Sequence, residues 1–237
     1  MAGKRLHKIV KRALQALDME VYTRTAVWPR HPEFVAARQR IEADGVTKYP
    51  VDRCFILFRL AQSLRDVEGD IIECGSRYGR STRFILDGFG MDSAKKLHVF
   101  DSFEGLSEPG QEDIVLDEGG EALWSKHDLA VGVDEFKKNI AGLADKVVVH
   151  KGWIPERFHE VEDKTFCLAH IDVDLYQPTL DTLKFVYDRM PPRGVIICDD
   201  YGSFSCPGAR RAFDEFFSTR PENVIELSSI QALVVKA

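Results

Sequence analysis

From Asp70 onward the sequence alternates between short apolar runs and longer segments with helical periodicity. The apolar runs are too short for helices, and they lie at residues 71–74, 97–100, 146–150, 166–171 and 195–198. Helical patterns fall between or after these runs, at residues 81–86, 134–143, 178–190 and 208–217. Such alternation is typical of a parallel sheet with helices on both faces, so it predicts a doubly wound α/β fold.

Two more apolar runs, at residues 224–227 and 232–235, follow the last helical pattern and are joined by a short polar link. They predict a C-terminal antiparallel hairpin. A mostly parallel sheet that ends in such a hairpin resembles the Rossmann-like class I methyltransferase fold.

Residues 1–45 lack the strand pattern and predict an N-terminal helical extension, which leaves residues 46–237 as the main domain. The first helix of the extension has a basic face, with Lys4 and Lys8, opposite an apolar face with Leu6 and Ile9. Two interpretations stay open. The helix covers the domain or forms a homo-oligomer interface, or it binds an anionic membrane or a protein partner.

Charge and hydropathy exclude several classes of protein. The 38 acidic residues outnumber the 32 Lys and Arg, which argues against a broad nucleic-acid-binding surface. No apolar run approaches the ~20 residues of a transmembrane segment, and the N-terminus lacks the core of a secretory signal. The five cysteines are an odd number, and most lie in apolar runs. We therefore expect buried free thiols in a cytoplasmic protein that acts on a small molecule.

A glycine-containing turn follows the first apolar run, in the segment I-I-E-C-G-S-R-Y-G-R-S-T at residues 71–82. Its spacing departs from the G-x-G-x-x-G pattern of dinucleotide-binding folds. Glu73 offers a negative charge to a ligand that carries an ammonium and a sulfonium, and Gly75 leaves room for that ligand. The turn therefore predicts a site for S-adenosylmethionine, with Ser81 at the start of the next helix. A tight turn without a ligand is the alternative.

The next two apolar runs end in residues suited to the same cofactor. Asp101 and Ser102 follow the second run, where a carboxylate typically accepts hydrogen bonds from ribose hydroxyls. Gly152 and Trp153 follow the third run, and an indole can stack on adenine. Trp153 as a plain core residue is the alternative.

Four carboxylates follow the fourth and fifth runs, Asp172 and Asp174 on one and Asp199 and Asp200 on the other. Because the carboxyl ends of parallel strands meet at one edge of the sheet, these side chains are expected to converge. Four such charges repel one another unless a cation is present, and oxygen ligands favour Mg²⁺. Capping of the following helices is the alternative. His170 suits either a core imidazole or a site role.

Residues 104–132 are rich in glycine and acids and have no clear period. An aperiodic segment of this length in a compact domain is usually functional or disordered, so we interpret it as a lid over the site.

Together these motifs resemble the macrocin O-methyltransferase family, over most of residues 66–220. The resemblance is carried by the glycine turn and by H-V-F-D-S-F-E-G-L at 98–106, L-W-S-K-H-D-L-A-V at 123–131, G-W-I-P-E at 152–156, I-D-V-D-L-Y-Q-P-T at 171–179 and G-V-I-I-C-D-D-Y-G at 194–202. Antibiotic-tailoring members of the family often have glycine where this chain has Val173.

The resemblance implies S-adenosylmethionine as the methyl donor and a Mg²⁺ ion held by Asp172, Asp199 and Asp200. It implies Asp174 as the general base. Glu73, Asp101 and Ser102 match the family's cofactor positions, and the segment of Trp124, His127 and Asp128 matches its mobile substrate lid, with His127 a second catalytic candidate.

The expected acceptor is a vicinal diol on a glycosylated natural product or a related sugar, since a metal ion can activate a hydroxyl while it orients two neighbouring oxygens. Two alternatives stay open. One is a catechol-type O-methyltransferase with a phenolic diol as substrate, and the other is a cofactor-binding partner protein without catalysis.

Overall fold

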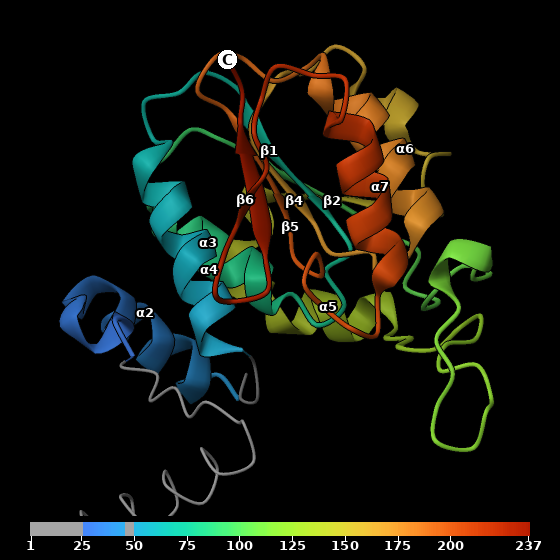
Figure 1. The fold of residues 1–237 in the computed structure, drawn as a ribbon. Coiled ribbons are helices and arrows are strands. Elements are labelled where there is room, and N and C mark those ends of the chain that lie inside the picture. The colour runs from blue at the N-terminus through green and yellow to red at the C-terminus, as the bar shows by residue number, and fades with distance from the viewer. Residues whose placement is uncertain (1–25, 46–49) are drawn as a thin grey trace, which may run out of the picture.

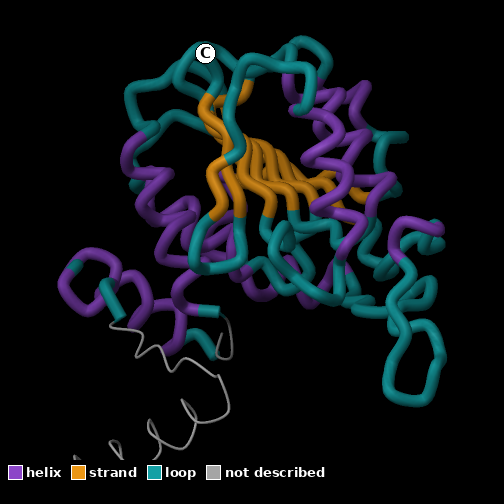
Figure 2. Tube along the Cα trace, in the orientation of Figure 1, coloured by secondary structure: helices purple, strands orange, loops and turns teal. Residues whose placement is uncertain are grey.

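The computed structural model describes residues 26–45 and 50–237. Its centre is a seven-stranded sheet in the order β3-β2-β1-β4-β5-β7-β6 (Figure 2). The strands are β1 (Asp70–Cys74), β2 (Leu97–Asp101), β3 (Val147–Lys151), β4 (Phe166–Ile171), β5 (Val195–Cys198), β6 (Ile225–Glu226) and β7 (Ala232–Val235). The first five are parallel, and β7 runs antiparallel to both β5 and β6. The predicted doubly wound sheet with a C-terminal hairpin is confirmed.

Helices cover both faces of this sheet (Figure 1). α3 (Val51–Ser63) and α4 (Arg80–Phe89) lie on one side, and α6 (Tyr176–Tyr187) and α7 (Pro207–Phe217) lie on the other. The remaining helical elements are η1 (Trp28–Arg30), α2 (Pro32–Ala43), η2 (Gln111–Asp113), α5 (Val133–Asn139), η3 (Ala141–Lys146) and η4 (Phe158–Val161).

The central strands β1, β4 and β5 are buried on both faces, and most of their residues are apolar. Ile71 packs with Leu57 of α3 and Ile85 of α4, whereas its neighbour Ile72 packs with Leu183 of α6 and Phe213 of α7. Successive residues of a strand point to opposite faces, so one short run supplies two cores. This explains why the strand patterns were continuous rather than alternating.

α3 was not among the predicted helices, although its sequence has helical periodicity. Cys54, Leu57, Phe58 and Ala61 are buried along one face. α3 approaches α4 closely at Gly88, where an added Cβ would lie 2.5 Å from the carbonyl oxygen of Phe58. This close packing fixes the start of α3 beside the carboxyl ends of the strands.

The N-terminal extension is described only from residue 26, so its predicted basic helix lies outside the described residues. α2 packs against the domain through Phe34, which stacks on Phe84 of α4 at 5.3 Å between ring centroids. Among residues 26–45 and 50–237, no helix has the length and apolarity needed to cross a bilayer. All five cysteines are buried free thiols, as predicted.

Candidate active site

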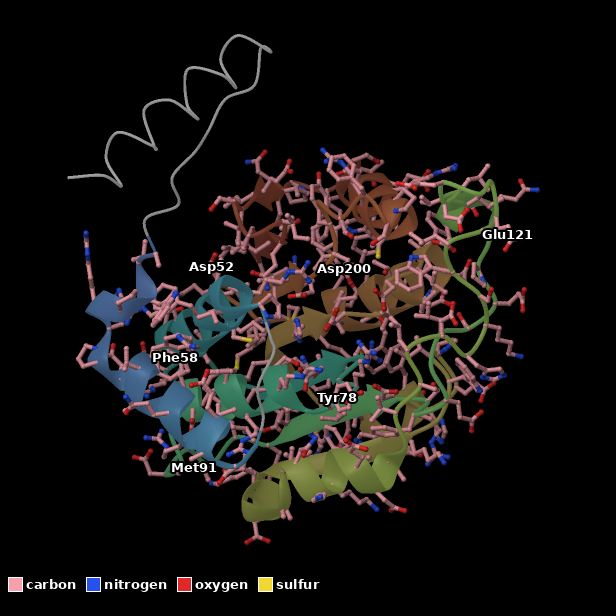
Figure 3. All side chains as sticks on the ribbon, turned by 90° about the horizontal axis from the view of Figure 1, so that it is seen from below. Asp52, Phe58, Tyr78, Met91, Glu121 and Asp200 are labelled. Carbon is pink, nitrogen blue, oxygen red and sulfur yellow. The ribbon has the colours of Figure 1, made fainter. Side chains whose placement is uncertain are left out.

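A cavity of about 310 Å³ opens at the carboxyl ends of the parallel strands. Figure 3 looks toward this end of the molecule, with Tyr78 and Asp200 near the middle and Glu121 at the edge. The predicted residues that line the cavity are Gly75, Ser81, Asp101, Ser102, Gly152, Trp153, Asp172, Asp174, Asp199 and Asp200. Glu73 and His127 are not among the lining residues. Residues separated by more than a hundred positions are thus brought to one site.

Gly75 is required by the neighbouring strand as well as by any ligand. Its φ of +80° is in the left-handed region, and an added Cβ would lie 1.8 Å from the carbonyl oxygen of Asp172. Its amide donates to Phe100, while the amide of Asp172 donates to Cys74. The glycine turn therefore joins the ends of β1, β2 and β4 at the edge of the cavity.

Glu73 lies beneath this cavity rather than in its lining, so its predicted contact with the cofactor stays a prediction. Its carboxylate is completely buried and accepts a hydrogen bond from the hydroxyl of Thr82. The other carboxylate oxygen lies 3.0 Å from Nδ1 of His170. The cause is register: Glu73 and His170 pair across β1 and β4, so their side chains lie on the same face.

His170 connects Glu73 to the acidic cluster. Its Nε2 lies 3.4 Å from Oδ1 of Asp199. Burial lowers the pKa of His170, but the hydrogen bonds and negative charges of Asp199 and Glu73 outweigh it and raise the pKa well above its usual value. His170 lines the cavity and is also a buried imidazole with hydrogen-bond partners, so it has features of both a core residue and a site residue.

Asp101 organises the glycine turn directly. Its Oδ2 accepts hydrogen bonds from the backbone amides of Ser76 at 2.8 Å and Arg77 at 2.9 Å. Its Oδ1 accepts from the amide of Phe103 at 2.7 Å. Oδ2 also accepts from the hydroxyl of Ser76 at 3.4 Å, whereas Oδ1 has a single donor among the described residues, so Oδ1 keeps capacity for a ligand hydroxyl.

The four aspartates form two compact groups with their neighbours. Ligand atoms of His170, Asp172 and Asp199 lie within 4.8 Å of one another, and so do those of Asp174, Asp200 and Cys206. The second group includes a thiol, because the loop before α7 brings Sγ of Cys206 to 3.5 Å from Oδ1 of Asp174. The three predicted ligands, Asp172, Asp199 and Asp200, all offer oxygen and stay a prediction.

The acids of this cluster are unequally compensated. Asp199 accepts a hydrogen bond from Gln231 at 2.6 Å and forms an ion pair with Arg53. Asp200 has one oxygen 3.3 Å from Arg53, while its buried Oδ2 has no hydrogen-bond donor in the described part of the chain. An uncompensated buried carboxylate oxygen is costly. A cation therefore fits this arrangement.

The pKa values of the aspartates differ according to how many donors and positive charges surround each one. Burial and the charges of Asp199 and Asp200 raise the pKa of Asp172. Burial and the charge of Asp200 raise the pKa of Asp174 to about 8. Burial also favours a higher pKa for Asp199, but His170 and Arg53 lower it overall. Perturbed acids in a cavity are typical of functional sites.

Arg53, Gln231 and Cys206 were missed by sequence reasoning. Arg53 projects from the first turn of α3 and reaches acids about 146 positions away in the sequence. Gln231 precedes β7, and Cys206 precedes α7. The periodicity of α3 was the only sequence signal that could have placed any of them.

Residues 104–132, the predicted lid, lie beside the cavity, and Leu129 and Val131 of this segment line its wall. The indole Nε1 of Trp124 donates to the carbonyl oxygen of Ser205 at 2.6 Å. His127 is exposed, and its Nδ1 lies 2.9 Å from the carbonyl oxygen of Glu104. His127 has a φ of +73° and is not among the lining residues of the cavity, and its catalytic role stays a prediction.

A sheet of this order, with its cavity at the carboxyl ends of the parallel strands, defines a class I methyltransferase fold. Solved structures agree. The O-methyltransferase NovP has a TM-score of 0.65 and 25% identity, covering 79% of this chain and 80% of that one. An O-methyltransferase from Bacillus cereus in complex with SAH has a TM-score of 0.56 and 18% identity, covering 96% and 97%.

The family model of macrocin-O-methyltransferase (TylF) matches residues 59–231, so the chain belongs to this family. One curated relative is the 8-demethyl-8-(2,3-dimethoxy-alpha-L-rhamnosyl)-tetracenomycin-C 4'-O-methyltransferase of Streptomyces olivaceus, 32% identical over 60% of this chain and 57% of the relative. Another is the mycinamicin III 3''-O-methyltransferase of Micromonospora griseorubida, 28% identical over 65% and 63%. The chain thus spans about three fifths of the length of these relatives.

Proposed function

We propose that this chain is an S-adenosylmethionine-dependent O-methyltransferase whose acceptor is one hydroxyl of a vicinal diol on a glycosylated natural product. The observation that carries the proposal is the cavity shared by the glycine turn and four converging carboxylates. The names of the related proteins support an acceptor of this class, since they describe methylation of such compounds. The five free thiols support a cytoplasmic location.

The cofactor would bind over the glycine turn. Gly75, Ser81, Asp101 and Ser102 line that side of the cavity, with Gly152 and Trp153 beyond them. Glu73 takes an indirect role, because it orients His170 beneath the site. A folded turn held by Asp101 keeps this half of the cavity in place before the ligand arrives, which lowers the cost of binding.

Asp172, Asp199 and Asp200 would hold Mg²⁺, and the uncompensated Oδ2 of Asp200 supports this choice. When bound, the ion would lower the pKa of a coordinated hydroxyl and orient a neighbouring oxygen. The ion pair between Arg53 and Asp199 keeps one positive charge at the cluster.

Asp174 would accept the proton of the acceptor hydroxyl. It stands in a turn with φ +60°, between β4 and α6, and its carboxylate lines the cavity. Non-glycine residues in this conformation are often found at functional sites, where surrounding contacts hold them. The walls of the cavity would align the acceptor oxygen with the methyl group of a bound cofactor, and such positioning supplies much of the rate in a reaction of this kind.

The test is methyl transfer from isotopically labelled S-adenosylmethionine to two panels of acceptors, rhamnosides with free vicinal hydroxyls and catechols. We expect turnover of a glycoside, its loss in excess chelator and its recovery with Mg²⁺. Binding of S-adenosylhomocysteine, measured by calorimetry, should change little on chelation. Full turnover in chelator would refute the metal role, and preferred turnover of catechols would assign the phenolic alternative. Cofactor binding without any transfer would favour the non-catalytic partner.

A further inference from the structure

The lid contains one buried carboxylate, Asp113, in an otherwise exposed stretch. Asp113 is 4% exposed, while Ile114 and Leu116 are each 60% exposed. Burial of a carboxylate costs free energy unless hydrogen bonds compensate it. The contacts of Asp113 therefore identify what the lid is built to hold.

Both oxygens of Asp113 accept backbone hydrogen bonds. Oδ2 accepts from the amide of Gly110 at 2.9 Å, within the lid. Oδ1 accepts from the amide of Tyr176 at 2.7 Å, 63 positions away. Tyr176 is the first residue of α6, and its predecessor Leu175 has no polar side chain to cap that helix. The lid thus supplies the helix cap, where a negative charge is favoured by the helix dipole.

Gly208 of α7 makes room for this contact. An added Cβ at Gly208 would lie 1.8 Å from Oδ1 of Asp113 and 2.8 Å from the amide nitrogen of Tyr176. Any side chain at this position would separate Asp113 from Tyr176. The hydrogen bond between Asp113 and Tyr176 therefore lies between α6 and α7.

Tyr176, whose amide Asp113 holds, lies two residues after Asp174. The turn between them is tight, with the amide of Leu175 donating to the carbonyl oxygen of Val173 at 2.6 Å. A second lid contact joins Trp124 to the carbonyl oxygen of Ser205. Ser205 is followed by Cys206, whose thiol lies 3.5 Å from Oδ1 of Asp174. These two lid contacts therefore hold two segments close to this carboxylate, the start of α6 and the loop that carries Cys206.

We propose that Asp113 is a positioning residue for Asp174, so that docking of the lid on α6 aligns the general base. The inference rests on the proposed function, because it assumes that Asp174 accepts the proton. In this arrangement, closure of the lid and alignment of the general base occur together. If the lid leaves α6, the turn that carries Asp174 loses its support.

The test compares Asp113→Ala, Asp113→Asn and Gly208→Ala with wild type under the acceptor and cofactor conditions that support turnover. We expect Asp113→Ala and Gly208→Ala to lower kcat roughly 10-fold to 100-fold, the usual effect of misplacing a reacting group by about 1 Å. The KM for the acceptor and the affinity for S-adenosylhomocysteine should stay within about threefold. Asp113→Asn should rescue part of kcat, since its amide oxygen can still accept from Tyr176.

Asp117→Asn is the matched control, because in the described part of the chain that carboxylate accepts hydrogen bonds from the backbone amides of Gly119 and Glu121, both within the lid. It should keep wild-type kcat. Hydrogen exchange at the amide of Tyr176 should accelerate in Asp113→Ala and in Gly208→Ala but not in Asp117→Asn, while core amides stay protected, which separates loss of the Asp113–Tyr176 hydrogen bond from global unfolding. A raised KM with unchanged kcat would mean that Asp113 only holds the lid over the bound acceptor and does not align Asp174, and would overturn the inference. Wild type without turnover would instead refute the proposed function itself.

Discussion

Buried acids stand at both ends of the sheet, and they differ in what surrounds them. At the carboxyl end, Asp172, Asp174 and Asp200 face one another, and burial with neighbouring negative charge raises their pKa values. At the amino end, Glu222 accepts hydrogen bonds from Tyr187 and Lys236, each at 2.9 Å. Lys236 follows β7, whose last residue pairs with the first residue of β5, so Glu222 belongs to the opposite end.

The contrast separates acids that stabilise the fold from acids that oppose it. Burial favours a higher pKa for Glu222, but its bonds to Lys236 and Tyr187 lower the pKa to about 2. A carboxylate among donors thus adds stability, whereas carboxylates among carboxylates subtract it. Proteins retain the second kind mainly where binding or catalysis requires it.

The largest expected effect is on catalysis, from Asp174→Asn. The variant should lower the rate of methyl transfer by about 10² to 10⁴, the usual contribution of a positioned general base. Binding of Mn²⁺ as a Mg²⁺ analogue should persist, measured by electron paramagnetic resonance. Asp181→Asn is the control, because that half-buried carboxylate accepts from Gln177 on α6. An unimpaired Asp174→Asn enzyme would assign the base elsewhere, with His127 and His170 the next candidates.

A smaller effect is expected on stability from Glu222→Gln, measured by urea unfolding. Because the folded pKa is about 2 and the ordinary value is 4.5, Glu222 stabilises the protein fully above pH 4.5. That contribution is lost as pH falls from 4.5 toward 2. With allowance for solvent screening, the variant should be about 1 to 2 kcal/mol less stable than wild type at pH 7.

The difference between wild type and Glu222→Gln should therefore shrink as pH approaches 2. Glu226→Gln is the control, since its exposed pair with Arg210 at 3.6 Å should contribute little. A pH-independent difference would show that Glu222 acts through packing rather than charge.

The smallest effect has the opposite sign. Asp172→Asn removes a buried acid whose ionisation is opposed by Asp199 and Asp200, so the metal-free protein should become about 1 kcal/mol more stable. Thermal unfolding in chelator would measure this. Loss of stability in the variant would place Asp172 with Glu222 among the structural acids and remove the contrast between the two ends.

Sequence patterns predicted most of the fold and much of the site for one physical reason. The strands are continuous apolar runs, and polar residues directly after them must lie at the edge of the sheet. Asp101, Asp172 and Asp199 were located in this way. α3 was missed, although its buried residues recur at helical spacing, because it precedes β1 and so lies outside the alternation of strands and helices that located the other helices.

Local sequence thus determined which residues form strands, where the glycine turn falls and which acids follow β4 and β5. Tertiary structure alone decided that Glu73 pairs with His170 beneath the cavity, and that Arg53 reaches Asp199. It also decided that Asp113 caps α6 from 63 positions away. Periodicity reports the direction of a side chain relative to its own element, whereas these contacts depend on register and on packing between elements distant in the chain.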